Sequence, residues 1–295
     1  MIMGLDIGGT TIKGGLVTKR GVVTKRASIP SNARRGQARF VENIERCIEL
    51  LGVENVDGIG VGCPGSMNPS RGIIIAPPNI PLRNFPLREY LARRYHLPVT
   101  VDNDANAFTL AEATLGAGKR YRSVVGLTLG TGIGGGIIID KTIEHGRGNA
   151  GELGYITLHM HGPRGKSGDV GSLQEYLRGE PLEKVKRALG LSRYSAKDLE
   201  MLGRQRKRIA LAYWKRFGEY LGIGIASIVH VLDPDIIVLG GSIARAFSLF
   251  REELTTTVRH RTVFPPPPIR RAALGNDAGI IGAALLTQKI LSTKS

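Results

Sequence analysis

The residues best suited to bind phosphate form a glycine turn near the start of the chain. Asp6 precedes the run Gly8-Gly9-Thr10-Thr11, and Lys13 follows shortly after it. Glycines let backbone N–H groups approach a phosphate, while hydroxyl and ammonium groups add further donors. A plain hairpin turn would need the glycines but not the threonines or the lysine. We therefore predict a phosphate site here, with Asp6 holding Mg²⁺ through bound water.

The same pattern occurs a second time along the chain. Gly4 to Thr10 and Gly126 to Gly132 both contain Gly-apolar-polar-apolar-Gly, and each is followed by a turn and another strand pattern. This echo indicates a duplicated unit. Two such turns facing each other would clamp a polyphosphate, so the second turn supplies the candidate contacts Gly130, Thr131, Gly132 and Gly134.

Two other nucleotide motifs are incomplete. Residues 60–65 match G-x-G-x-x-G, but Pro64 and the residues after it do not open a helix, as a dinucleotide site requires. Residues 165–167 end like a P-loop, yet Met160 stands where the first glycine of that motif belongs. The sequence therefore favours neither a Rossmann nor a P-loop enzyme.

A cluster of polar side chains ends a predicted strand in the first half of the chain. Asp102, Asn103, Asp104 and Asn106 lie within five residues. One of them is expected to cap the following helix, because Asp and Asn are favoured N-caps. The others exceed what a cap needs, and a carboxylate beside a helix N-terminus can accept a hydroxyl proton. A similar Asn-Asp-Ala run at 276–278 lacks such a cluster and is interpreted as a cap.

Glu152 lies among glycines and small residues, a setting that suits close approach to ligand hydroxyls, although an exposed loop glutamate is an equally simple interpretation. His145, His159 and His161 lie nearby and resemble a metal cluster. No cysteine occurs between residues 140 and 180, and His159 and His161 are expected to alternate on a strand. We therefore predict structural or solvent-facing roles for these histidines.

The hydrophobic pattern predicts alternating strands and helices, as in an α/β fold. Strands are expected at 1–7, 14–17, 22–29, 58–62, 99–102, 124–129, 134–139, 235–239 and 269–274. Helices are expected at 40–51, 86–95, 105–115, 181–190, 204–232, 243–260 and 278–291. Residues 64–86 and 144–179 are expected to form irregular loops.

The composition excludes several classes of protein. A chain of 295 residues is long enough for about two domains. No apolar run approaches the roughly 20 residues of a membrane span, no signal-peptide pattern opens the chain, and a cytoplasmic protein is expected. Cys47 and Cys63 are too few for a disulfide framework and are expected to be packed thiols. The net charge of +16 is scattered, and aromatic residues are only 5%, which favours a solvated basic surface over a specific nucleic-acid partner.

Together these motifs resemble the ROK family of sugar kinases and repressors, within the actin-like ATPase superfold. The resemblance covers essentially the whole chain, because further motifs follow in the family's order at 61–65, 76–79, 103–106, 151–152, 239–242 and 276–279. It implies an α/β fold of two actin-like ATPase (ribonuclease H-like) domains around a central cleft. The implied domains are 1–116, which also contains the C-terminal helix 279–295, and 117–278.

The resemblance also implies roles for individual residues. Asp104 would be the base that takes the proton of a sugar hydroxyl. Contacts to the sugar would come from Gly65, Asn79, Asn103, Asp104 and Glu152. Contacts to the ATP adenosine would come from Gly240, Gly241 and Ser242, beside the two glycine turns.

One region departs from the family pattern. The family has a zinc site built from a histidine and cysteines, and the aligned positions here carry Tyr155, Gly165, Ser167 and Ser172. Neutral hydroxyls and a glycine are poor zinc donors, so we predict no zinc. The family's second sugar carboxylate is replaced by Gln174, with Glu175 adjacent. These two residues and Tyr155 are further candidate sugar contacts.

The resemblance implies ATP-dependent, Mg²⁺-dependent phosphorylation of a hexose, glucose foremost, at the 6-hydroxyl, a step of glycolysis. A kinase for fructose or an N-acetylhexosamine is the close alternative. A sugar-responsive repressor is a third, but it would need a helix-turn-helix ahead of the first phosphate strand. A sugar-binding scaffold without catalysis is disfavoured by Asp104, and a homodimer is left open.

Overall fold

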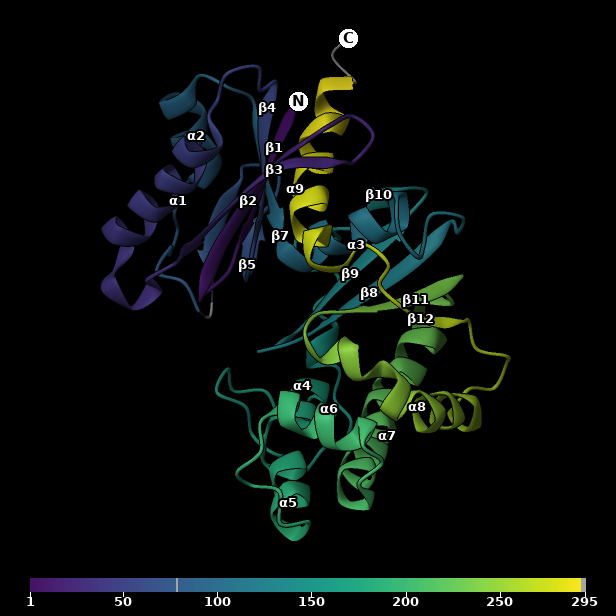
Figure 1. Ribbon diagram of the computed structural model, residues 1–295. Coiled ribbons are helices and arrows are strands. Elements are labelled where there is room, and N and C mark those ends of the chain that lie inside the picture. Colours follow the sequence, from purple (N-terminus) through teal and green to yellow (C-terminus); the bar gives the residue numbers. More distant parts are fainter. Residues whose placement is uncertain (78, 293–295) are drawn as a thin grey trace. The chain divides into compact units, whose positions relative to one another are not determined.

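The computed structural model describes residues 1–77 and 79–292, which form two compact units (Figure 1). The first unit consists of Met1–Arg122, Gly136–Gly151 and the segment from Ala273, and the second of Ser123–Gly135 and Glu152–Ala272. The described residues form two five-stranded sheets. The first lies within the first unit, while the second includes β10 (Thr142–Ile143) and part of β9 (Ile133–Ile139), which belong to the first unit, together with strands of the second unit. The domain bounds at 116 and 279 stay predictions, and residues 293–295 of the predicted last helix lie outside the described residues.

The sheet of the first unit has the strand order β3-β2-β1-β4-β7. Its strands are β1 (Ile2–Ile7), β2 (Thr11–Val17), β3 (Val23–Pro30), β4 (Gly58–Cys63) and β7 (Val99–Asn103). The first three form an antiparallel meander, while β1, β4 and β7 run parallel. Parallel strands place their carboxyl ends at the same edge, which is where the predicted polar cluster lies.

Helices cover this sheet because its strands are apolar and glycine-rich. They are α1 (Gln37–Leu51), α2 (Leu87–Tyr95), α3 (Asp104–Thr114) and α9 (Ala278–Ser292), with a short 3₁₀ turn η1 (Ala33–Arg35). A side chain at Gly4 or Gly60 would collide with backbone carbonyls of α9, so these glycines let α9 pack directly on β1 and β4. Cys47 and Cys63 are fully buried and not bonded to each other, as predicted.

The second sheet has the order β10-β9-β8-β11-β12. Its strands are β8 (Ser123–Leu129), β9 (Ile133–Ile139), β10 (Thr142–Ile143), β11 (Ile236–Gly240) and β12 (Ile269–Arg271). β11 runs parallel to both β8 and β12. The helical elements after β10 are η2 (Leu153–Tyr155), α4 (Leu173–Arg178), α5 (Glu180–Ala188), α6 (Ala196–Arg204), α7 (Arg208–Leu232), η3 (Ile243–Ala246), α8 (Phe247–Arg261) and η4 (Gly275–Asp277).

The helices of the second unit share an aromatic core. The ring centroids of Trp214 on α7 and Phe250 on α8 are 5.8 Å apart. The centroids of Trp214 and Phe217, both on α7, are 5.5 Å apart. Gly218 permits this close approach, because a side chain there would lie 2.7 Å from the carbonyl oxygen of Phe250. No helix in the described residues is long and apolar enough to cross a membrane.

Several predictions of local structure were wrong. The irregular loop expected over 144–179 contains helix α4 (Leu173–Arg178), which the cap Ser172 starts. The helix expected over 204–232 is broken, because Arg206 has a left-handed backbone (φ 57°) between α6 and α7. The loop expected over 64–86 contains an antiparallel pair, β5 (Ser66–Asn68) and β6 (Ile73–Ala76). His159 and His161 lie in a turn rather than on a strand, with the His161 N–H donating to His159 Nδ1 at 3.1 Å. Pairing here is limited to isolated bridges, since Gly162 and Pro163 interrupt it.

Candidate active site

The carboxyl edge of the first sheet gathers three acidic or polar strand ends. In the register of the parallel strands, Asp6 is level with Gly62, Gly62 is level with Asp102, and Cys63 is level with Asn103. Burial raises the pKa of the Cys63 thiol well above its ordinary value, and the nearby charges of Asp104 and Asp6 raise it further. Both carboxylates therefore lie near the same buried thiol.

Asp6 is the predicted magnesium residue. Burial raises the pKa of its carboxyl, and Lys13, its partner across the β1–β2 hairpin, lowers it. A side chain at Gly279 would lie 2.7 Å from Asp6 Cγ, so the carboxyl lies against the first turn of α9. A partly buried carboxylate at a strand end suits a hydrated Mg²⁺, which takes one or two protein carboxylates and keeps several waters.

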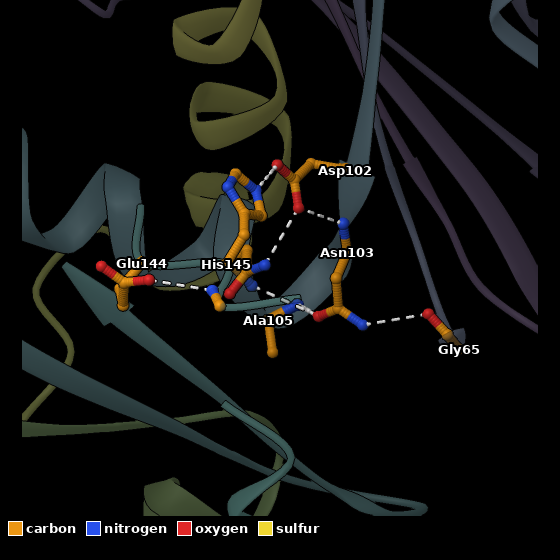
Figure 2. A network of polar contacts seen from close by, with 8 residues as sticks. Gly65, Asp102, Asn103, Ala105, Glu144 and His145 are labelled. Carbon is orange, nitrogen blue, oxygen red and sulfur yellow. Dashed lines mark hydrogen bonds and ion pairs between the residues drawn. The ribbon is translucent and has the colours of Figure 1, made fainter. Parts of the chain in front are cut away.

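Asn103 is the helix cap that the sequence predicted within the polar cluster (Figure 2). Its Oδ1 accepts the backbone N–H of Ala105 at 2.8 Å and of Asn106 at 3.3 Å. Its Nδ2 lies 3.5 Å from the carbonyl oxygen of Gly65, whose φ of 96° glycine adopts without strain. Asp104, the predicted base, is the first residue of α3. Three predicted sugar-site residues thus lie together at one strand end.

Asp102 is held by hydrogen bonds that the sequence analysis did not foresee. Its side chain is buried, and Oδ1 accepts the Asn103 N–H at 2.7 Å and Asn106 Nδ2 at 2.9 Å. Its Oδ2 lies 2.6 Å from Nε2 of His145, and this hydrogen bond raises the pKa of the imidazole (Figure 2). Because the partners are 43 residues apart, no local sequence signal could have paired them.

The first glycine turn contacts a predicted sugar residue. The Gly8 N–H donates to the carbonyl oxygen of Thr11 at 3.0 Å, and the Ser31 hydroxyl donates to that of Gly9 at 2.6 Å. A side chain at Gly9 would lie 2.9 Å from the carbonyl oxygen of Asn79, so Asn79 packs on the turn. Only the family resemblance had suggested Asn79. Pro78, in the same motif, lies outside the described residues.

The second glycine turn lies in the second unit, between β8 and β9. The Gly130 N–H donates to the carbonyl oxygen of Gly132 at 3.0 Å, and no atom lies within 4 Å of where a Gly130 side chain would begin. Gly241, with φ 83°, packs on the backbone of Leu129 at the end of β8. The structure thus brings the 130–132 turn and the predicted adenosine segment 240–242 together, while Gly134 lies within β9.

Two hollows differ in their relation to the predicted site. One of about 120 Å³ in the second unit is lined by Ser242, with Lys197, Glu200 and Arg245. Another of about 720 Å³ lies on the first unit between α2, β7 and α9, and it contains none of the predicted site residues. The smaller hollow is therefore the one that belongs with the predicted adenosine segment.

Glu152 begins the region that departs from the family pattern. Its carbonyl oxygen accepts the N–H of Tyr155 at 3.1 Å, and partial desolvation raises the pKa of its carboxyl, although the side chain reaches the surface. Gln174 Oε1 accepts the Ile133 N–H at 3.1 Å, so this predicted sugar residue holds the strand after the second glycine turn. Glu175 is in the first turn of α4.

Hydrogen bonds hold the positions where the family pattern has zinc ligands. The hydroxyls of Tyr155 and Ser167 lie 3.4 Å apart. The Gly165 N–H donates to the carbonyl oxygen of Asp169 at 2.7 Å, and the buried Ser172 caps α4 by accepting the Glu175 N–H at 3.3 Å. In the part of the chain that the structure describes, no three His, Cys, Asp or Glu side chains are grouped to hold a metal. That the protein contains no zinc stays a prediction.

Two glycine turns, each followed by an antiparallel strand of a five-stranded mixed sheet, define the actin-like ATPase fold, and solved structures of sugar kinases share it. Residues 2–290 match the ROK family, and the chain belongs to that family.

Individual relatives match nearly the whole of this chain. The glucokinase of Halalkalibacterium halodurans is 33% identical, over 97% of this chain and 94% of the relative. The crystal structure of a ROK family glucokinase from Streptomyces griseus, in complex with glucose and AMPPNP, superposes with a TM-score of 0.86 at 28% identity, covering 98% and 99% of the two chains. A ROK family transcriptional regulator, a homologue of the E. coli MLC protein, gives 0.85 at 25% identity, covering 97% of this chain and 77% of that one.

Proposed function

We propose that this protein is an ATP-dependent hexokinase that phosphorylates the 6-hydroxyl of a hexose, with glucose as the foremost substrate. The observation that carries the proposal is Asp104 at the N-terminus of α3, beside Asn103 and Gly65 at the carboxyl edge of the first sheet. Membership of the ROK family and the similarity to glucokinases support it. The similarity to glucokinases also favours an enzyme over a protein that binds sugar without catalysis.

Asp104 acts as the general base in this proposal. As the sugar oxygen attacks the γ-phosphorus of ATP, an O–P bond forms and the hydroxyl proton moves to the Asp104 carboxylate. The bond from the γ-phosphorus to the bridging oxygen breaks, and ADP leaves with the electron pair. Such a transfer depends on positioning and charge stabilisation more than on covalent chemistry. The capped N-terminus of α3 keeps the Asp104 carboxyl in place and favours its ionised form.

Two groups of residues would bind the nucleotide. The first turn, with Gly8, Gly9, Thr10, Thr11 and Lys13, offers N–H, hydroxyl and ammonium donors to the phosphates. The second group, 130–134 with 240–242, would hold the rest of ATP, and the small hollow beside Ser242 supports the adenosine assignment. Mg²⁺, when bound, neutralises phosphate charge, and Asp6 would hold it through water.

Polar groups from several segments of the chain are the proposed sugar contacts. They are Gly65, Asn79, Asn103, Glu152, Tyr155, Gln174 and Glu175. Gln174 already accepts the Ile133 N–H with its oxygen, so its amide nitrogen is the group left for a sugar hydroxyl. Replacing a carboxylate acceptor with an amide donor at this position would alter which hydroxyls are preferred.

A coupled assay of ADP release tests the proposal directly. Purified protein is given ATP and Mg²⁺ with glucose, mannose, fructose, galactose or N-acetylglucosamine, and the product of the best substrate is located by NMR. We expect turnover with glucose, phosphate on O6 and loss of turnover on chelation of Mg²⁺. Faster turnover of N-acetylglucosamine or fructose would identify that sugar, rather than glucose, as the substrate. Absence of turnover with every hexose would overturn the proposed function.

The similarity to a transcriptional regulator calls for a second experiment, a test of DNA binding. We propose a cytoplasmic enzyme with no specific nucleic-acid or membrane partner, despite the charge of +16. Fragmented genomic DNA should bind weakly and lose affinity steeply as salt rises. Retention of a defined fragment at physiological salt would favour a repressor. Light scattering in the same buffer would decide between a monomer and a homodimer.

A further inference from the structure

We propose that His145 is a positioning residue for the phosphoryl transfer: its hydrogen bond to Asp102 holds the strand-to-helix junction that presents Asp104. The inference rests on the proposed function. It concerns only residues of the first unit. His145 does not touch the reacting atoms in this proposal and acts through Asp102.

The Asp102 carboxylate accepts three hydrogen bonds. It is 4% exposed, and its two oxygens receive the Asn103 N–H, Asn106 Nδ2 and His145 Nε2 at 2.7, 2.9 and 2.6 Å. Because a carboxylate can only accept, Nε2 is the donor in the last of these. Within the described residues, His145 is the donor to Oδ2, and without it the buried carboxylate would lose part of its charge compensation.

Asp102 in turn determines where Asp104 lies. It holds the backbone N–H of Asn103, whose side chain caps α3, and it holds the side chain of Asn106 one turn into the helix. Asp104 is between these two anchored residues. If Asp102 turned toward water to replace the lost donor, both anchors would weaken and the base would shift. Displacement of a reacting group by about 1 Å can cost on the order of 10² in rate.

His145 stands on a turn that is itself fixed. Its carbonyl oxygen accepts the N–H of Gly148 at 2.7 Å and of Ala150 at 3.1 Å. Asn149 Oδ1 accepts the hydroxyl of Ser66, the residue after the predicted sugar contact Gly65, at 2.8 Å. The imidazole therefore links this turn to Asp102 at the end of β7, beside the helix cap Asn103 (Figure 2).

Electrostatic attraction strengthens the hydrogen bond between His145 and Asp102. This hydrogen bond, and the charges of Asp102 and Glu144, raise the pKa of His145 above 6.5, against the lowering effect of burial. The other charged residues on the neighbouring helices are Asp104 and Glu112 on α3 and Lys289 on α9. A protonated imidazole compensates the negative charge of the buried Asp102 carboxylate.

The sign of the pH dependence follows from the raised pKa. The stabilising contribution of the pair is fully present below pH 6.5, the unfolded value, and is lost as pH rises through the folded value. The neutral imidazole can still donate from Nε2. We therefore expect an alkaline fall in kcat, rather than abrupt unfolding.

The test compares His145→Ala, His145→Gln and the exposed control His260→Gln. The alanine variant should lose kcat by about 10-fold to 100-fold, with a smaller rise in the KM for glucose. Glutamine places an amide nitrogen near the position of Nε2, so it should restore most of kcat at neutral pH while flattening the alkaline limb. The control should match the wild type. All three are compared at temperatures where circular dichroism shows them folded.

An NMR titration of the imidazole supplies a readout without turnover. The His145 pKa should lie above 6.5 in the wild type and fall in Asp102→Asn. An unchanged pKa in that variant would overturn the pair, and a wild-type kcat and pH profile in folded His145→Ala would overturn the positioning role alone. A wild-type protein without hexokinase activity would instead overturn the proposed function, and the positioning role with it.

Discussion

The edge of the first sheet and the loop from Glu152 to Gly179 are held in different ways. At the sheet edge, strand register sets the backbone and buried side-chain hydrogen bonds fix Asp102 and Asn103 on top of it. In the loop, each link is a single hydrogen bond or an isolated bridge, such as the one between Thr157 and Ser172. The proposed base Asp104 thus follows a strand end held by several buried hydrogen bonds, whereas the proposed sugar contacts Glu152, Tyr155, Gln174 and Glu175 lie in a segment with fewer strand pairings.

The second region contains the positions where the family pattern has zinc ligands. Tyr155 and Ser167, at two of these positions, have hydroxyls 3.4 Å apart, and Ser172 is a buried helix cap. A zinc ion would bind such loop positions together far more strongly than a 3.4 Å hydrogen bond does. We infer that local hydrogen bonds suffice here because α4 is also anchored by the buried Leu173 and Leu177.

The largest expected effect lies at the sheet edge. Asp104→Asn keeps the size of the side chain but removes the proton acceptor, which should lower kcat by about 10²–10⁴-fold. Calorimetry should show glucose affinity nearly unchanged. Asp57→Asn is the matched control, because that exposed aspartate pairs with the N-terminal amine at the opposite edge of the first sheet, and its kcat should stay at the wild-type value. A near-normal kcat in Asp104→Asn would remove the general base from the mechanism.

The two glycine turns should differ in their tolerance of a methyl group. Gly9→Ala places Cβ 2.9 Å from the Asn79 carbonyl oxygen, and overpacking of this kind costs about 1–3 kcal/mol of the free energy of unfolding. Gly130→Ala meets no atom within 4 Å and should leave that free energy nearly unchanged. Urea unfolding monitored by Trp214 fluorescence and circular dichroism compares the two. Equal losses would mean that Asn79 does not pack on the first turn.

A smaller effect is expected at the positions where the family pattern has zinc ligands. Ser172→Ala removes a buried cap and should lower the free energy of unfolding by about 1 kcal/mol. Ser167→Ala removes one partner of a long surface contact and should change it by less than about 0.5 kcal/mol. The same urea experiment measures both variants. A larger loss at Ser167 would show that the Tyr155 hydroxyl, rather than the α4 cap, holds the loop.

Zinc removal should have no effect. Elemental analysis of protein purified without a His-tag should find well under one zinc per chain, since hydroxyls are poor zinc donors. A zinc-selective chelator should leave the melting temperature unchanged, and activity should be complete once Mg²⁺ is restored. Stoichiometric zinc, or melting at a lower temperature after chelation, would show that His159 and His161 with other groups had rebuilt the site.

Local sequence was informative wherever short-range physics decides the structure. The strand pattern at 99–102, followed by polar residues, predicted both the helix cap and the carboxylate beside it, and Asn103 is that cap. The glycines of the 8–11 and 130–134 segments predicted tight turns between strands, because period-two patterning and turn residues act over a few positions. The helix expected over 204–232 is interrupted at Arg206 and continues only from Arg208. Residues 204–207 contain neither glycine nor proline, so the sequence did not indicate this interruption.

Contacts between distant segments could be known only from the tertiary structure. His145 reaches Asp102 from 43 residues away, and Glu112, fully buried, accepts the backbone N–H groups of Ala117, Ala273 and Leu274. Asn79 packs on Gly9 across the first unit, and Gln174 holds the Ile133 N–H. Residue types and local spacing limit what each side chain can do. Its actual partner depends on strand register and helix packing, which bring together segments whose separation along the chain carries no local signal.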